Sequence, residues 1–111
     1  MRKPGAPTRD LERDFQEQVI ELARYNGFKL IYHTYDSRRS APGFPDLVLC
    51  RPPRLIFAEL KSESGGVTVE QQRWLEALWE SGVEAFLWRP SDLDAIARIL
   101  SRSATPSEAS R

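Results

Sequence analysis

The sequence has one cysteine, no long hydrophobic run and no signal peptide, and each of these shortages excludes a class of protein. Its 111 residues include only Cys50, so no disulfide can form within the chain, and its place near a predicted turn favours a reduced protein over a thiol enzyme. No apolar stretch approaches the ~18 residues needed to span a membrane. The first five residues lack the apolar core of a signal peptide. We therefore expect a cytoplasmic protein that does not engage a membrane.

The chain also has no net charge, because sixteen Lys and Arg balance sixteen Asp and Glu. A dedicated nucleic-acid-binding module usually carries a basic excess, so this balance weighs against one. Arg38 and Arg39 are still candidates for phosphate contacts, since they stand immediately before the loop over residues 40–44. The alternative is that they serve only solubility. Weaker candidates for phosphate contacts are His33, Lys29, Arg51 and Arg54. The alternative for His33 is that it is an ordinary strand residue.

Length and composition predict one domain with its own hydrophobic core. Residues 1–8 and 102–111 are rich in Pro, Ser, Ala and Arg and are expected to be disordered tails on a domain over 9–101. Apolar periodicity and turn residues within that domain predict the order α-β-β-β-α-β-α. The expected helices cover about 9–25, about 69–81 and the stretch after Pro90, and the expected strands cover 28–35, a hairpin and 83–88.

The hairpin is predicted from two apolar runs, Leu47–Leu49 and Leu55–Ala58, separated by Cys50–Arg54. The two prolines in the middle of that separator cannot continue a strand ladder, so a turn is expected there. A right-handed β-α-β crossover would make the second arm of the hairpin parallel to the strand over 83–88. The predicted fold is therefore α/β, with a mixed sheet flanked by helices.

The hairpin brings two carboxylates together. If it folds symmetrically about its prolines, Asp46 lies opposite Glu59, with Cβ atoms roughly 5 Å apart. Side chains alternate along a strand, so Glu59 and Lys61 project to the same side.

This acid, acid and lysine set has the chemistry of a metal-dependent phosphodiesterase. Mg²⁺ is usually held by one or two carboxylates together with substrate phosphate, and Asp46 and Glu59 fit that description. Lys61 would position the nucleophile or stabilise the transition state, and it would need a depressed pKa to take a proton directly. The alternative is that Asp46 only shapes a turn after Pro45 and that Glu59 and Lys61 form a solvated charge pair.

Glu12 is a candidate third acid. Within the first helix it falls within roughly 40° of the centre of the apolar stripe, so it is predicted to face the core. A carboxylate there is costly unless a metal or a lysine pairs with it. The alternative is that Glu12 reaches solvent at the edge of the stripe or interacts with the helix dipole.

These residues together resemble a known family. The matching order is Glu12-x-x-Phe15-Gln16, then Gly43-Phe44-Pro45-Asp46-Leu47, then Glu59-Leu60-Lys61, then Thr68-x-x-Gln71. Over about residues 9–100 the chain resembles the VRR-NUC nucleases of the PD-(D/E)xK superfamily, whose small stand-alone members are typical of bacteriophages and bacteria. The resemblance implies a restriction-endonuclease-like core.

The resemblance also implies an activity and its partners. It implies structure-selective cleavage of DNA with Mg²⁺ or Mn²⁺, often of branched or Holliday-junction DNA and by a homodimer, with no small-molecule cofactor. Glu12, Asp46 and Glu59 would bind the metal and Lys61 would be the catalytic lysine. The alternatives are a non-catalytic DNA-binding or assembly module, in which these side chains form an ion-pair network, and a restriction-like endonuclease that reads sequence.

Gln71 and two tryptophans each have two interpretations. The resemblance places Gln71 near the scissile phosphate or the metal-bound water, whereas the run Thr68–Gln71 is a capping-box pattern in which its side chain returns to the helix cap. We expect only one of these two roles to be filled. Trp74 and Trp79 stand at helical spacing among leucines and are expected in the core or at a dimer surface rather than stacked on bases.

Overall fold

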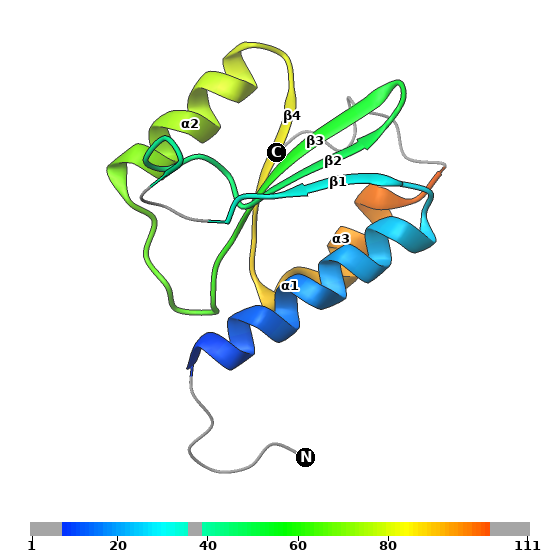
Figure 1. Ribbon diagram of the computed structural model, residues 1–111, viewed down its shortest axis with the longest axis horizontal. Helices are drawn as coiled ribbons and strands as arrows, with labels where there is room; N and C mark the ends of the chain where they lie inside the picture. Colours follow the sequence, from blue (N-terminus) through cyan, green and yellow to red (C-terminus); the bar gives the residue numbers. More distant parts are fainter. Residues whose placement is uncertain (1–7, 36–38, 103–111) are drawn as a thin grey trace.

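The computed structural model describes residues 8–35 and 39–102. Its elements are, in order, α1 (Thr8–Tyr25), β1 (Leu30–His33), β2 (Leu47–Arg51), β3 (Arg54–Leu60), α2 (Val69–Glu80), β4 (Glu84–Trp88), a short 3-10 helix η1 (Pro90–Asp92) and α3 (Leu93–Leu100). Helices α1 and α3 cover one face of a four-stranded sheet, and α2 lies on the other face (Figure 1). The predicted α/β fold and element order are confirmed.

The sheet is mixed, with the strands in the order β1-β2-β3-β4. β1, β2 and β3 pair antiparallel, and β3 and β4 pair parallel, as the predicted crossover requires. The hairpin register joins Leu47 to Ala58 and Arg51 to Arg54, which is the symmetry expected about its two prolines. The turn is shorter than predicted, because pairing continues to Arg51 and Arg54 and leaves only the two prolines, which have no N–H to donate, unpaired.

The main core lies between the sheet and the pair of helices α1 and α3. Buried side chains of α1 pack there against alternate residues of the strands, and the core is completed from α3; its members are Phe15, Val19, Ala23, Phe28, Leu47, Leu49, Ile56, Ala58, Phe86, Trp88, Ile96 and Leu100. Phe28 was expected in a strand over 28–35, but its buried ring and its N–H bond to the Ala23 carbonyl (2.9 Å) keep it outside β1. β1 is therefore four residues long.

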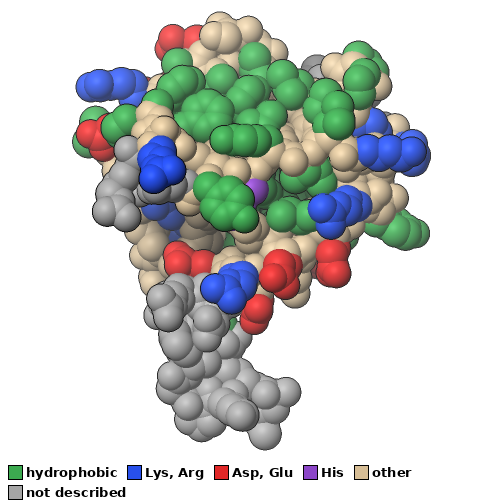
Figure 2. Space-filling view, in the orientation of Figure 1, with side chains coloured by type: hydrophobic (Ala, Val, Ile, Leu, Met, Phe, Trp, Pro, Cys, Tyr) green, Lys and Arg blue, Asp and Glu red, His purple; other side chains and the backbone are tan. Residues whose placement is uncertain are grey.

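Helix α2 covers the other face over β3 and β4. The Trp79 indole N–H donates to the Ala85 carbonyl of β4, and Phe44 makes edge-on ring contacts with Phe57 (6.1 Å between centroids) and Trp74 (5.1 Å). Both tryptophans are therefore structural, as predicted. In the orientation of Figure 1, hydrophobic side chains gather over the region of α2 and the strands (Figure 2).

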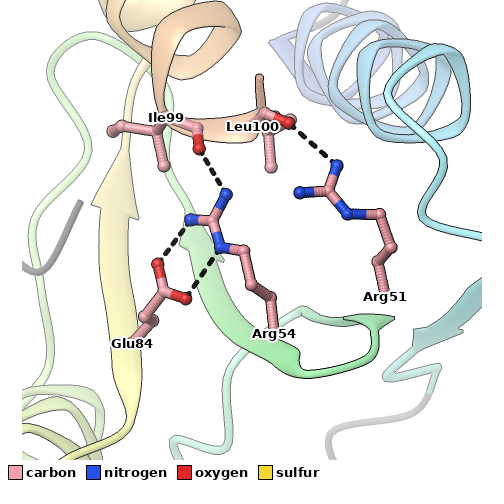
Figure 3. A network of polar contacts seen from close by, with 5 residues as sticks. All are labelled: Arg51, Arg54, Glu84, Ile99 and Leu100. Atoms are coloured by element: carbon pink, nitrogen blue, oxygen red, sulfur yellow. Dashed lines mark hydrogen bonds and ion pairs between the residues drawn. The ribbon is translucent and has the colours of Figure 1, made fainter. Parts of the chain in front are cut away.

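Two arginines at the hairpin tip fasten the sheet to α3 (Figure 3). Arg54 is 4% exposed and makes a two-bond contact with Glu84 of β4, at 2.6 and 3.1 Å, while its third nitrogen donates to the Ile99 carbonyl at 2.8 Å. Arg51 donates to the carbonyls of Asn26 and Leu100. All three guanidinium nitrogens of Arg54 donate within the fold, whereas Arg51 donates there through one nitrogen, and DNA contact by these arginines stays a prediction.

The predicted tails lie mostly outside the described residues. Thr8, assigned to the first tail, already begins α1, and Arg102 is the last residue described. Within the described part of the chain, no helix is long and apolar enough to cross a membrane.

Candidate active site

Asp46 and Glu59 meet where β2 begins and β3 ends. Asp46 stands one residue before β2, and its Oδ2 accepts a hydrogen bond from the backbone N–H of Leu60 at 2.8 Å. Thr34 holds this segment from the end of β1, since its N–H donates to the Asp46 carbonyl (2.8 Å) and its hydroxyl to the Pro45 carbonyl (2.7 Å). The side-by-side placement of the two carboxylates follows from the register that the sequence predicted.

Glu59 is buried, with 3% of its surface exposed. Burial and the neighbouring Asp46 carboxylate raise the pKa of Glu59 to about 8, although Lys61 acts in the opposite direction. Its Oε2 accepts from the Gln71 side chain at 3.0 Å, whereas its Oε1 is buried with no hydrogen-bond donor. When Glu59 is protonated it can donate a hydrogen bond to the Asp46 carboxylate, and this bond also raises the pKa of Glu59. An unpartnered carboxylate oxygen beside a second carboxylate suits a cation.

The donor set fits a hard divalent ion. Two carboxylates in a partly open site match the way Mg²⁺ is usually held, with water and phosphate oxygens completing its shell. Among residues 8–35 and 39–102, no group of three or more His, Cys, Asp and Glu is arranged to hold a metal. Asp46 and Glu59, whose carboxylates are close enough to interact, are the residues that would hold the ion.

Glu12 does not face the core, and that prediction is wrong. Its side chain is exposed, and the buried positions of the α1 stripe begin at Phe15. The angle around the helix axis was correct for the stripe, but the first turns of α1 extend past the sheet, so a residue there has no core to enter. Glu12 instead lines a cleft that also contains Lys61.

Gln71 completes the helix cap and also contacts Glu59, so the cap does not keep its side chain away from the candidate site. Its Oε1 accepts from the Thr68 N–H (2.9 Å) and its N–H donates to the Thr68 hydroxyl (3.1 Å), which completes the capping box. Its Nε2 points the other way and donates to Glu59. The cap and the contact with Glu59 coexist because the two ends of one amide bond different partners.

The loop before Asp46 packs directly on the start of α2. Gly43 has a positive φ of 83°, and a Cβ there would lie 2.4 Å from the carbonyl carbon of Glu70 and 2.6 Å from the Gln71 nitrogen. Only glycine permits this contact. The segment that carries Asp46 and the helix that carries Gln71 are thereby fixed to each other.

Arg89 is a positioning residue that the sequence did not reveal. Lys61 ends the pairing of β3 with β4, its N–H donating to the Trp88 carbonyl at 3.0 Å. The loop that follows is held by one nitrogen of Arg89, which donates to the carbonyls of Ser62 (2.6 Å), Gly65 (2.8 Å) and Glu63 (3.3 Å). The carbonyls that accept these bonds lie 24 to 27 residues from Arg89 in the sequence, so no local sequence pattern predicts the contacts.

The sequence of the chain matches the family model for the VRR-NUC domain over residues 5–91. The chain belongs to the VRR-NUC domain family. This membership implies a nuclease-type role in DNA processing. Among curated proteins none matches the chain.

Two solved structures have a similar fold. One, described as a VRR_NUC domain, has a TM-score of 0.65 and 23% sequence identity, over 84% of this chain and 97% of the other. The second, described as a VRR_NUC domain protein, has a TM-score of 0.61 and 22% identity, over 79% of this chain and 84% of the other. At these identities the likeness concerns the fold of the VRR-NUC domain.

Of the proposed DNA contacts of this VRR-NUC domain, His33 faces the opposite side of the sheet from Glu59. His33 is half-buried on β1, pairs with Leu47 and therefore faces the α1 side, and its ring lies 5.1 Å from that of Tyr35. Arg39 is exposed at the start of the loop that leads to Asp46. Arg38 lies outside the described residues.

Proposed function

We propose that this VRR-NUC domain is a metal-dependent, structure-selective DNA endonuclease that hydrolyses phosphodiester bonds in branched DNA such as Holliday junctions or flaps. The observation that carries the proposal is the half-buried Asp46 carboxylate beside the buried Glu59 carboxylate near the end of β3, with Lys61 one residue beyond that strand. A structural ion-pair network predicts that Glu59 contacts a cationic side chain, whereas the side chain that donates to its Oε2 is the neutral amide of Gln71, so a binding module explains the site less well.

The cofactor of the proposed reaction is Mg²⁺ or Mn²⁺. Asp46 and Glu59 would hold it. Glu12, which the family resemblance adds to the set, lines the cleft beside Lys61, and within the described residues it does not form a three-acid group with those two carboxylates. When bound, the ion supplies Lewis acidity, which lowers the pKa of water and offsets charge on the phosphate.

The protein groups around the carboxylates have separate tasks. Gln71 keeps the Glu59 carboxylate in one orientation by donating to Oε2, which leaves Oε1 directed to the cation. Lys61 brings a compact positive charge to the scissile phosphate. Arg89 keeps the loop after Lys61 in place, which preserves the distance between that charge and the carboxylates.

We also propose that the active form is a homodimer, because two strands must be cut in a symmetric junction. An uncovered apolar part of the sheet supports this. Leu30 and Tyr32 are 67% and 58% exposed, and by register they share the α2 face with Val48 and Cys50, beyond the edge that α2 covers. Light scattering with and without junction DNA tests this proposal, and a monomer mass in both samples would remove it.

Cleavage of a labelled DNA panel tests the proposed activity. The panel contains a four-way junction, a flap, a splayed arm, a plain duplex and a single strand, each with Mg²⁺ or Mn²⁺. We expect metal-dependent cuts that Lys61→Ala abolishes and that Arg98→Ala, which removes an exposed positive charge on α3, retains. Folded protein that cuts no member of the panel would favour a binding module.

A stability measurement tests the metal site without relying on activity. A ligand that binds only the native state raises its stability, so Mg²⁺ or Mn²⁺ should raise the melting temperature of the wild type. Asp46→Asn should remove this response. An equal response in both proteins would place the ion elsewhere.

A further inference from the structure

A cleft of about 570 Å³ opens beside Lys61, on the side of α1. One wall is the first half of α1, from Leu11 to Gln18, and the other is the segment from Leu60 to Ser64, with Pro90 at its end. Figure 1 shows the start of α1 beneath this segment. Because Lys61 itself lines the cleft, whatever fills it lies next to the proposed reaction centre.

The cleft is formed in advance of any ligand. Arg89, which directly precedes η1, donates to the carbonyls of Ser62 and Glu63 in the outer wall and of Gly65 just after it, and these bonds fix that wall. The Glu63 carboxylate is tied as well, since it accepts from the backbone N–H of Ser91. A volume of this size is within the range of sites for small organic ligands, about 300–1,000 Å³.

The lining suits an uncharged planar group better than a phosphate. Leu11, Phe15 and Leu60 supply apolar surface, of which Leu11 is 37% exposed. Glu12 and the other carboxylates of the cleft, those of Asp14 and Glu63, would repel a phosphodiester but accept hydrogen bonds from exocyclic amino groups. An unstacked nucleobase has both an apolar face and such edges.

We propose that this cleft binds one unstacked nucleobase of the substrate, on the nucleotide next to the phosphate that Lys61 contacts. The inference rests on the proposed nuclease function and deepens it. A base inside a continuous duplex reaches such a pocket only after it is unpaired and unstacked, which costs a few kcal/mol. The substrates are therefore DNAs with an unpaired nucleotide beside the cut, as in flaps and at open branch points.

Abasic substitution in the DNA tests the pocket. A flap substrate that the wild type cuts is remade with a single abasic nucleotide at each position around the cut. We expect cleavage to slow about tenfold at one position and to stay unchanged at the others, because stacking of one base contributes about 1–3 kcal/mol. Equal cleavage of all the abasic substrates would overturn the proposal.

A protein variant links the effect to the cleft. Leu11→Ala removes apolar surface from the wall of the cleft, so it should slow cleavage of the intact flap and reduce the penalty at the sensitive abasic position. Tyr25→Ala, at the other end of α1, should keep the wild-type pattern. A full abasic penalty in Leu11→Ala would overturn the proposal. If the wild type cuts no member of the DNA panel, the nuclease function itself fails and this inference fails with it; if it cuts other members but not the intact flap, only this inference is overturned.

Discussion

Burial beside the Asp46 carboxylate raises the pKa of Glu59 to about 8. Below that pH the folded protein holds a proton that a free glutamate, with a pKa of 4.5, has lost. The same burial that makes Glu59 hard to ionise leaves its Oε1 without a donor. Metal binding must therefore compete with a proton, and affinity for Mg²⁺ should rise with pH toward 8.

The stability of the metal-free protein should also depend on this proton. Between about pH 4.5 and 8 the folded state binds more protons than the unfolded state at Glu59, so the free energy of unfolding falls as pH rises. The contribution is at most about 1.4 kcal/mol per pH unit. Urea unfolding across this window measures it. Glu59→Gln should flatten the slope, whereas Glu80→Gln, an exposed carboxyl on α2, should not; equal slopes in all three proteins would contradict the assignment.

Gln71 permits its two roles to be separated by mutation. Thr68→Ala removes the cap acceptor and should cost about 1 kcal/mol of stability while cleavage persists. Gln71→Glu keeps an acceptor for the Thr68 N–H but loses the donor to Glu59 and adds a carboxylate beside it. Cleavage should fall on the order of tenfold, as expected for a lost hydrogen bond to a charged group. Urea unfolding and cleavage rates should be compared for both variants; equal losses of activity would refute separate roles.

Among the elements, the loop between β3 and α2 receives three of its hydrogen bonds from one side chain, that of Arg89. Arg89→Ala removes three donor contacts to Ser62, Glu63 and Gly65, which should cost about 1–3 kcal/mol and allow Lys61 to move. A displacement near 1 Å can reduce kcat about a hundredfold. We expect lower kcat, little change in KM and faster amide hydrogen exchange over residues 62–65. Arg98→Ala, on the exposed side of α3, is the matched control; unchanged exchange in Arg89→Ala would show that the loop holds itself.

The elements that the sequence predicted well are those specified by local patterns. The hairpin register follows from its central prolines and two short apolar runs, and α2 follows from its capping box and leucine spacing. These patterns involve residues close together in the sequence, so they can be interpreted without knowing how the helices and strands pack. The position of Asp46 beside Glu59 was predictable because it depends only on the hairpin.

The features that the sequence missed depend on how elements are placed against each other. The direction of Glu12 around α1 was calculated correctly, but no pattern states how far α1 extends beyond the sheet. Arg54 looks like a surface residue in sequence, and only the parallel pairing of β3 with β4 brings Glu84 beside it. The Arg89 contacts and the cleft are of the same kind, because both need the fold before they exist.

At the scale of the whole molecule, the hairpin tip, β4 and α3 are joined by an ion pair and by hydrogen bonds from two arginines (Figure 3). Arg54 and Glu84 are both buried, and Arg54 also caps α3 through the Ile99 carbonyl. Arg51 joins the ends of α1 and α3 to the same tip through Asn26 and Leu100. This end of the molecule lies away from the carboxylate pair along β3, so it stabilises the fold without entering the proposed chemistry.

Removing one partner of the buried pair should be far more damaging than removing both. Arg54→Met leaves Glu84 charged or protonated in an apolar setting and should cost about 3–5 kcal/mol, whereas combining it with Glu84→Leu should recover most of that loss. Arg98→Met provides the exposed comparison on α3. Urea unfolding of the four proteins measures the differences, with DNA cleavage followed well below each melting temperature to separate stability from activity. A single substitution no more costly than Arg98→Met would mean that the sheet and α3 are held together by apolar packing alone.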